Sequence, residues 1–343
     1  MLTQTDQFTG AQHWPVAEPD SVGVNSDRLA AAYEAASRIA PIQSLLVARY
    51  GRLVGEQYFG SCSPQSEGNI RSITKSVVSA LVGIALHKGY IQSLDNPIAA
   101  WLPEIQELQA NPHAKEITLR HLLTMSAGLW WIENTGGLRR LYRSTDWVRF
   151  ILSLPATRKP GEQFNYNTTL SHLTSVILTR ASGMNTLTFA ERFLFHDLGI
   201  PIRRWDTDPQ GIYIGGSDLY LTPRQLLMFG QLYLQQGSWP RQQLVPREWV
   251  SQSTQKQIAL DRPGFWNPAY TAYGYSWWLR RYHGHAAAVA SGYAGQNIVV
   301  LPSLALVVVT TANAEVPYSG VMMQANLIDV VIDDYVIPSI QEV

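Results

Sequence analysis

The residues with the clearest chemical potential are a serine and a lysine at the start of a long apolar segment. Ser72 and Lys75 open the stretch SITKSVVSALVGIALHKG, which runs from residue 72 to residue 89. Residues three apart on a helix project from the same face, so the lysine amine can reach the serine hydroxyl. Backbone NH groups at a helix start also favour the negative charge of an attacked carbonyl oxygen. The pair therefore predicts a nucleophilic serine whose proton is taken by a lysine.

This interpretation requires both side chains to point into a cavity. A lysine that is desolvated there has a lowered pKa and can act as a base. The alternative is that Ser72 only caps the helix and that Lys75 is an exposed residue of its first turn. The S-x-x-K pattern alone does not separate the two, because it often occurs by chance.

The segment 72–89 is predicted to be a central, buried helix. Apolar residues fall on two of its faces, and Lys88 and Gly89 close it as a last-turn cation and a C-cap. A stripe of small residues lets another element pack closely along one side. The stripe consists of Ser72, Ser76, Ser79 and Gly83.

Composition excludes several classes of function. Lys plus Arg and Asp plus Glu number 26 each, and only 15% of the 343 residues are charged, so nucleic acid is not an expected partner. No apolar run reaches the roughly 18 residues of a membrane span, and we expect a soluble, cytoplasmic protein. Cys62 is the only cysteine, which excludes an internal disulfide. His283 and His285 form H-x-H, but no metal site is predicted because ligand partners are missing from the pattern.

The order of the segments predicts an α/β (α+β) protein with an antiparallel sheet, flanking helices and a large inserted helical region. A helix capped by Asn25 or Ser26 precedes a hairpin around Tyr50-Gly51-Arg52. Strand-like segments return near the C-terminus, before a final helix through residues 325–337. We expect one unit over residues 1–343, with a sheet region at 20–91 and 263–343 and a mainly helical region at 92–262.

The sequence around the serine resembles a known family. The stretch NIRSITKSVVSALVGIALHKGYIQSLDNPIAAWLPE and the later ITLRHLLTMSAGL resemble the superfamily of serine β-lactamases and penicillin-binding proteins. The likeness is to its branch of class C-like esterases and 6-aminohexanoate-dimer hydrolases, and it runs from about residue 20 to 335. It implies a β-lactamase/transpeptidase-like fold, Ser72 as nucleophile, Lys75 as the assisting base and no cofactor.

A second element of that superfamily, Y-x-N, has a partial counterpart in GEQFNYNTTLSHL. The resemblance implies that Tyr166 relays a proton in the active site. Thr168 stands where the asparagine is expected, and Asn167 precedes it. Asn167 and Thr168 are therefore the candidates for the substrate contact that the asparagine normally makes.

The third element, K-T-G or H-T-G, has its best counterpart in Ala290-Ser291-Gly292. Ser291 and Gly292 become candidate substrate-binding residues, and the NH of Tyr293 joins the NH of Ser72 as the implied oxyanion hole. Gly292 and Gly295 allow close backbone approach. The family's cation, which helps to hold a substrate carboxylate, is replaced by Ala290. This replacement favours an ester or amide that lacks such a carboxylate.

The hypothesis from these elements is a serine hydrolase that acts on small esters or short amides through an acyl-enzyme. One alternative is a β-lactamase or D-alanyl-D-alanine peptidase, and another is a binder or sensor that does not turn over. No G-x-S-x-G occurs, which removes the main support for an α/β-hydrolase. We expect a possible homodimer. The candidates for an aromatic pocket wall are Trp130, Trp131, Trp266, Trp277 and Trp278.

Overall fold

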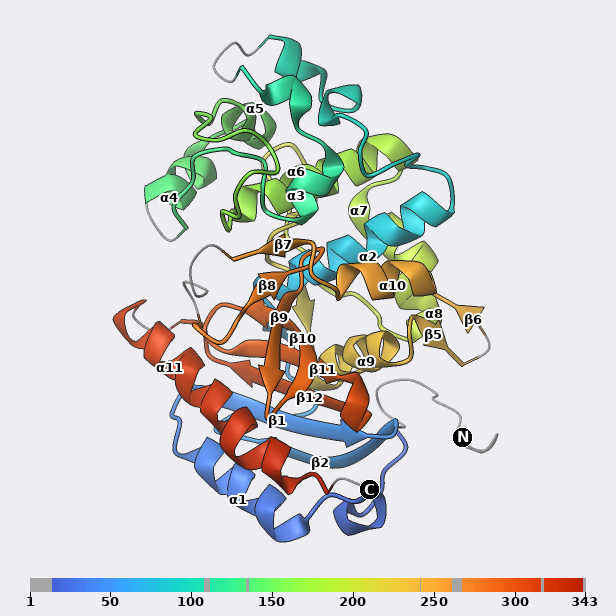
Figure 1. Ribbon diagram of the computed structural model, residues 1–343, viewed down its shortest axis with the longest axis vertical. Helices are drawn as coiled ribbons and strands as arrows, with labels where there is room; N and C mark the ends of the chain where they lie inside the picture. Colours follow the sequence, from blue (N-terminus) through green and yellow to red (C-terminus); the bar gives the residue numbers. More distant parts are fainter. Residues whose placement is uncertain are drawn as a thin grey trace.

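One eight-stranded sheet combines two strands from the N-terminal part of the sequence with six from the C-terminal part (Figure 1). The computed structural model describes residues 14–107, 112–133, 136–240, 242–260, 267–315 and 318–341. The strand order is β2-β1-β12-β11-β10-β9-β8-β7, and all neighbours pair antiparallel. The predicted antiparallel sheet is confirmed. Its strands are β1 (Ile42–Arg49), β2 (Arg52–Tyr58), β7 (Ile258–Ala259), β8 (Ala272–Tyr273), β9 (Trp278–Tyr282), β10 (His285–Gly292), β11 (Gln296–Leu301) and β12 (Leu306–Ala312).

Two short ribbons and the helices complete the described fold. The ribbons are β3 (Gly68–Asn69) with β4 (Tyr220–Leu221), and β5 (Ser238–Trp239) with β6 (Gln242–Gln243). The α-helices are α1 (Ser26–Ser37), α2 (Ile73–His87), α3 (Leu119–Leu123), α4 (Gly136–Arg143), α5 (Trp147–Leu152), α6 (Thr168–Ser182), α7 (Thr186–Ala190), α8 (His196–Leu198), α9 (Pro223–Leu234), α10 (Arg247–Ser253) and α11 (Tyr318–Val331). Single turns of 3₁₀-helix lie at Pro19–Val22, Ile98–Ala100, Pro103–Gln106, Ala114–Glu116, Pro302–Leu304 and Ile337–Ser339, and π-helical turns lie at Glu191–Phe195 and Ile332–Val336.

Helices cover both faces of the sheet. A side chain added at Gly55 on β2 would collide with Tyr33 of α1. The strand register puts Gly55 on the same face as Val308 of β12. The preceding residue, Val307, therefore points to the opposite face, where it lies against Gly230 of α9. The sheet is thus the middle layer between α1 and α9.

Helix α9 packs on the sheet. Residues 223–234 fall within 92–262, the part predicted to be mainly helical, and α9 lies against β1, β11 and β12. The helices gathered at the far end of the molecule in Figure 1 are α3, α4, α5, α6 and α7. Only packing decides which layer a helix joins.

Local signals at the first helix and hairpin are confirmed. The side chain of Asn25 accepts a hydrogen bond of 2.8 Å from the NH of Arg28, which caps α1. Tyr50 and Gly51 adopt φ values of 52° and 76° between β1 and β2. Two successive left-handed residues are the signature of a type I′ turn, whose twist matches a hairpin.

The helix α2 lies in the centre of the molecule, as the sequence predicts. Every residue from Ile73 to Ala85 is buried. The stripe of small residues brings other segments close: the hydroxyls of Ser76 and Ser79 donate to backbone carbonyls of residues 276 and 275 at 2.7 and 2.8 Å. Gly83 lies directly against the indole of Trp249. The helix is therefore held on this side by close packing and by two buried hydrogen bonds.

Among the helices in the described ranges, none has both the length and the hydropathy of a membrane span.

The contact at Gly83 predicts the effect of adding one methyl group. A Cβ there would lie 2.2 Å from Cγ of Trp249, and forcing it in costs about 1–3 kcal/mol. This outweighs the gain of up to about 1 kcal/mol in helix propensity, because an indole ring cannot bend away. Gly83→Ala should lower the free energy of unfolding in urea. Gly68→Ala, where nothing lies within 4 Å, is the matched control, and a Gly83→Ala protein as stable as wild type would contradict the packing argument.

Candidate active site

The serine and the lysine meet at the N-terminus of α2. Nζ of Lys75 donates to Oγ of Ser72 at 2.7 Å and to the carbonyl oxygen of Gly216 at 2.7 Å. Lys75 is only 1% exposed, whereas Ser72 lines a cavity. The amine is therefore held in place by two acceptors, and one of them is the hydroxyl that faces the cavity.

A tight turn before α2 presents Ser72 to this cavity. Arg71 has a φ of 53°, and Asp218 on a facing loop has a φ of 66°. Left-handed backbone at non-glycine residues costs about 1–3 kcal/mol each and must be held by its surroundings. Asn69 provides that support, since its Oδ1 accepts from the NH of Arg71 at 2.9 Å and its Nδ2 donates to Asp218 at 2.6 Å. The ribbon β3–β4 and this amide thus fix the direction in which α2 begins.

Burial lowers the proton affinity of the Lys75 amine, which suits it to act as a base. Desolvation lowers the pKa of Lys75 to about 8, although the charges of Glu133 and Asp218 act in the opposite direction. Roughly one tenth of the amine is therefore unprotonated at pH 7, and about half at pH 8. An unprotonated amine 2.7 Å from Oγ can accept the hydroxyl proton of Ser72.

Tyr166 is a second neighbour of the same hydroxyl. Lys75 Nζ is 5.2 Å from the centre of the Tyr166 ring. Burial raises the pKa of Tyr166 well above its ordinary value, the charge of Glu133 adds to this, and a hydrogen bond to Ser72 opposes it. The phenol therefore keeps its proton at neutral pH and acts as a donor. Between the two neighbours of Ser72, Lys75 is the one suited to accept a proton.

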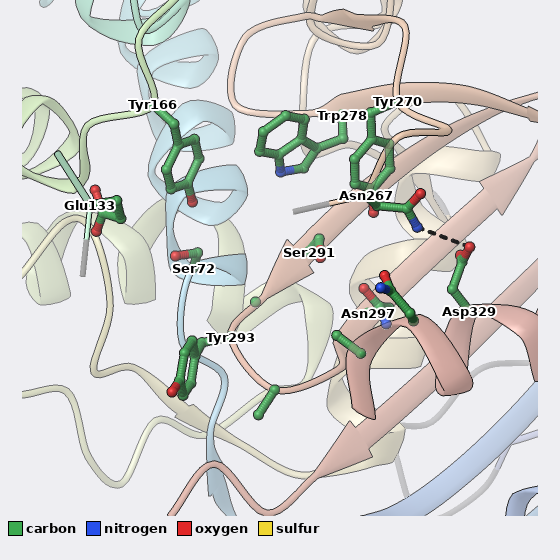
Figure 2. Close-up of a pocket in the computed structure, with 14 residues that line it drawn as sticks. Ser72, Glu133, Tyr166, Asn267, Tyr270, Trp278, Ser291, Tyr293, Asn297 and Asp329 are labelled. Carbon is green, nitrogen blue, oxygen red and sulfur yellow. Dashed lines mark hydrogen bonds between the residues drawn. The ribbon is translucent and has the colours of Figure 1, made fainter. Parts of the chain in front are cut away.

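Figure 2 shows the cavity on which these groups converge. One wall is aromatic: Trp278 stacks on Tyr166 at 5.3 Å and on Tyr270 at 4.9 Å between ring centres. Polar groups from β11 and α11 lie opposite. The lining consists of Ser72, Glu133, Tyr166, Asn267, Tyr270, Trp278, Ser291, Gly292, Tyr293, Ala294, Asn297, Ala325, Asn326 and Asp329. An apolar wall facing a few placed polar groups is typical of small-molecule sites.

The C-terminal end of β10 forms the edge of the cavity next to Ser72. Ser291, Gly292 and Tyr293 all line it, as their prediction as substrate-binding and oxyanion-hole residues requires. A Cβ at Gly292 would lie 2.6 Å from the carbonyl oxygen of Ile70, so only glycine lets this strand approach the turn before α2. Ala290 is absent from the lining because it pairs with Ile298 and is buried.

The structure gives Asn167 a different place from the one expected. Asn167 is the N-cap of α6, and its Oδ1 accepts from the NH of Thr169 at 3.0 Å and from its hydroxyl at 2.6 Å. It is 1% exposed and does not belong to the lining of the cavity. The side-chain oxygen of Asn167 is therefore occupied by the helix start, and a contact between Asn167 and substrate stays a prediction.

Thr168 holds the carboxylate of Glu133. Its hydroxyl donates to Oε1 of Glu133 at 2.6 Å, and its NH donates to Oε2 at 3.0 Å. Thr168 does not line the cavity, but Glu133 does. The position expected to hold the family's asparagine thus positions a carboxylate, and the carboxylate reaches the site.

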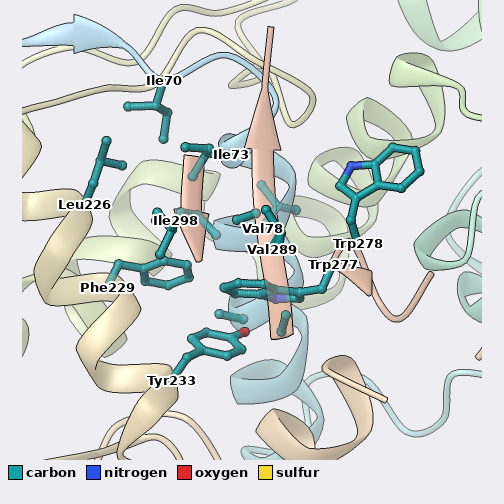
Figure 3. Packing of buried hydrophobic residues seen from close by; sticks show 14 of the residues in the cluster. Ile70, Ile73, Val78, Leu226, Phe229, Tyr233, Trp277, Trp278, Val289 and Ile298 are labelled. Carbon is teal, nitrogen blue, oxygen red and sulfur yellow. The ribbon is translucent and has the colours of Figure 1, made fainter. Parts of the chain in front are cut away.

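The tryptophans divide between cavity and core. Trp278 lines the cavity, whereas its neighbour Trp277 is fully buried against Tyr233 and Phe229 (Figure 3). Trp131 donates to Glu133 at 2.7 Å, and Trp130 is 45% exposed. Trp266 lies outside the described residues. Adjacent residues on a strand point to opposite faces, which separates Trp277 from Trp278.

The two histidines of the H-x-H pattern contact separate partners. Nε2 of His283 lies 2.8 Å from the carbonyl oxygen of Asp333, and Nδ1 of His285 lies 3.0 Å from the hydroxyl of Ser303. Within the described ranges, no group of three or more His, Cys, Asp or Glu side chains is arranged to hold a metal ion.

Sequence reasoning missed several contributors to the site. Gly216, whose carbonyl orients Lys75, lies in the GGSD stretch to which no chemical role was given. The two successive glycines were the available signal, because a Cβ at Gly216 would lie 2.7 Å from the carbonyl oxygen of Thr168. Glu133 and Asp329 carried no recognisable signal, since each comes to the cavity only through long-range packing.

Comparisons with known proteins agree with this geometry. The beta-lactamase family model matches residues 30–331. Esterase EstB of Burkholderia gladioli is 26% identical over 176 residues, which is 45% of this chain and 44% of EstB; the match therefore spans less than half of that relative. A structure from Bacillus anthracis named as a 6-aminohexanoate-dimer hydrolase is similar with a TM-score of 0.70, 18% identity and coverage of 93% of this chain and 87% of that one. EstCE1, described as a hydrolase with promiscuous acyltransferase activity, has a TM-score of 0.73 at 16% identity, with coverage of 90% and 98%.

The buried amine predicts a pH-dependent contribution to stability. The pKa of Lys75 is about 8 in the folded protein and about 10.4 in the unfolded chain, so between these values the unfolded state binds more protons. The free energy of unfolding therefore rises with pH across this window, by on the order of 3 kcal/mol from this group.

Lys75→Met removes the titration while keeping an unbranched side chain. The difference in unfolding free energy between wild type and Lys75→Met should shift in favour of wild type from pH 8 to pH 10.4, as measured by urea unfolding. Other titrating groups cancel in the difference. A difference that does not change across this window would contradict a buried, weakly basic Lys75.

Proposed function

The chain belongs to the beta-lactamase family, and we propose that it is a serine hydrolase that cleaves small esters or short amides through an acyl-enzyme. The observation that carries this proposal is the 2.7 Å contact between the amine of Lys75 and the hydroxyl of Ser72 beside a cavity that Ser72 lines. A nucleophile, a base with a pKa of about 8 and room for a substrate are the minimum for covalent acyl transfer. The names of EstB and EstCE1 are consistent with this chemistry.

In the first step, Oγ of Ser72 attacks the substrate carbonyl carbon while its proton passes to the neutral amine of Lys75. The carbonyl electrons move to oxygen, and the backbone NH groups of Ser72 and Tyr293 are assigned to stabilise that negative charge. Collapse of the intermediate breaks the bond to the leaving group. Tyr166, which keeps its proton, is placed to protonate the departing oxygen or nitrogen and is reprotonated from Lys75.

In the second step, water replaces the leaving group. Neutral Lys75 takes a proton from the water, which attacks the acyl carbon. The intermediate then expels Oγ of Ser72, which takes that proton back from Lys75, and the acid is released. Each proton that enters the site thus leaves with a product. This chemistry needs no cofactor, and general acid–base help of this kind contributes roughly 10²- to 10⁴-fold.

The charge of the cavity favours substrates without a carboxylate. Among the residues that the structure describes, its lining contains two acids, Glu133 and Asp329, and no lysine or arginine. Ala290 leaves the strand beside Ser72 without the cation that resemblance to β-lactamases leads one to expect. A penicillin carboxylate would meet negative charge here, which weighs against the β-lactamase and peptidase alternatives. A homodimer and a cytoplasmic location stay predictions.

Removal of the nucleophile is the first test. Wild-type protein should hydrolyse p-nitrophenyl butyrate with an initial burst and many turnovers, and Ser72→Ala should lose both because no acyl-enzyme can form. Ser79→Ala is the control, since this hydroxyl lies on the same helix but donates to a backbone carbonyl. Equal rates in wild type and Ser72→Ala would end the proposal. A single equivalent of product with a stable adduct by mass spectrometry would instead indicate a sensor.

The pH dependence of acylation provides a second test. Because the neutral amine of Lys75 is the base, kcat/KM for p-nitrophenyl butyrate should rise with pH and level off above a midpoint of about 8. The raised pKa of Tyr166 means that its proton is not lost within this range. Initial rates from pH 6 to pH 9.5, corrected for spontaneous hydrolysis, measure the profile. A rate that is constant or falls between pH 7 and pH 9 would exclude Lys75 as the base.

A further inference from the structure

Glu133 is a carboxylate at the cavity whose protein contacts are all neutral. Its Oε1 accepts from the hydroxyl of Thr168 at 2.6 Å. Its Oε2 accepts from the NH of Thr168 at 3.0 Å and from the indole NH of Trp131 at 2.7 Å. Both oxygens act only as acceptors, which is the pattern of an ionised carboxylate. Three donors therefore fix Glu133 in position without neutralising its charge.

The charge of Glu133 acts on the amine of Lys75, but the hydrogen bonds of that amine go to Ser72 and Gly216. In the described part of the chain, no lysine, arginine or histidine forms an ion pair with Glu133. Asp329, the other acid of the lining, differs in this respect because it is paired with Arg280. Glu133 is thus the unpaired acid of the cavity.

The remaining bonding capacity of Glu133 is directed at the site. A carboxylate offers about four acceptor positions, and Oε1 uses one of its two. Figure 2 places Glu133 beside Ser72 and Tyr166, on the side away from the aromatic wall of Trp278 and Tyr270. A donor bound at Glu133 would therefore lie close to the reacting carbonyl.

We propose that Glu133 binds a positively charged amine of the substrate, so that the enzyme prefers esters or amides that carry an ammonium group a few bonds from the scissile carbonyl. This inference rests on the proposed hydrolase function and specifies its substrate class. An ammonium group supplies both the donor and the charge that Glu133 lacks, whereas a neutral alkyl group supplies neither. A carboxylate on the substrate would be repelled.

The effect of Glu133 on Lys75 supports the same conclusion. The charge of Glu133 raises the pKa of Lys75, and this makes the base less available at neutral pH. A cation bound at Glu133 offsets that influence and favours the neutral amine. A bare carboxylate beside the base is therefore a disadvantage that an ammonium substrate removes.

The experiment compares substrates of equal shape and different charge. The p-nitrophenyl ester of 3-aminopropanoate is isosteric with the butyrate ester, and the glycinate ester with the propionate ester. At pH 7, wild type should show a kcat/KM at least about tenfold higher for the ammonium ester of one pair, the size expected for a charged hydrogen bond. Spontaneous hydrolysis is subtracted for each ester.

Two variants assign the preference to Glu133. Glu133→Gln keeps the size and an acceptor but removes the charge, so the ratio of ammonium to alkyl ester should fall to about one. Thr168→Val, which removes the hydroxyl that positions Glu133, should lower the ratio by a smaller factor. Glu34→Gln, on the exposed side of α1, is the matched control and should keep the wild-type ratio. An unchanged ratio in Glu133→Gln would overturn the assignment.

The ester and amide experiments distinguish failure of this inference from failure of the proposed function. If wild type hydrolyses both members of each pair equally, the protein is a hydrolase and the ammonium preference is wrong. If no ester is turned over, binding decides: 3-aminopropanamide should bind wild type at least about tenfold more tightly than butanamide, with the change in tryptophan fluorescence as the signal. Equal binding of the two amides overturns the inference without any reference to catalysis.

Discussion

The burial of one amine is the constraint on which the site depends. Lys75 sits inside the first turn of α2 with 1% of its surface exposed, where a charged lysine is costly. The structure tolerates it because Ser72 and the carbonyl of Gly216 accept hydrogen bonds of 2.7 Å from the amine, and because burial lowers the pKa of Lys75 to about 8. The same desolvation that makes Lys75 a burden on stability makes it a useful base. A solvated lysine at this position would hold its proton and leave Ser72 unreactive.

Four segments distant in sequence must meet for this to hold. The turn before α2 aims Ser72, the loop at Gly216 receives the amine, the start of α6 delivers Tyr166, and the end of β10 closes the edge at Gly292. Two of these junctions use a close backbone approach, as the collisions expected for a Cβ at Gly216 and Gly292 show. The strained φ of Arg71 is tolerated because the amide of Asn69 bonds to it. Glycine at positions 216 and 292 is thus needed for these segments to come together.

Different parts of the molecule determine where the nucleophile lies and which chemical groups line the cavity. Family membership, the sheet and α2 fix where the nucleophile and base lie. Other residues of the cavity lining come from separate segments: Glu133 from the helical region, Trp278 from β9 and Asp329 from α11. An acidic, half-aromatic cavity on this scaffold differs from one built to hold a carboxylate. The distribution of charge around Ser72, more than the fold, is what distinguishes the substrates that this chain can accept.

The sequence by itself determined the elements whose signals are local. The S-x-x-K spacing and the apolar faces of α2, the cap at Asn25 and the hairpin at Tyr50 all depend on neighbours within a few residues, and resemblance to a family added Tyr166, Gly292 and Tyr293. Tertiary structure alone decided that Asn167 caps a helix, that α9 joins the sheet, and that Trp277 and Trp278 face different ways. It alone brought Glu133 and Gly216 to the serine. The physical reason is that propensity and periodicity act along the chain, whereas a site is made by contacts between residues far apart in it, and these are set by packing that no single segment encodes.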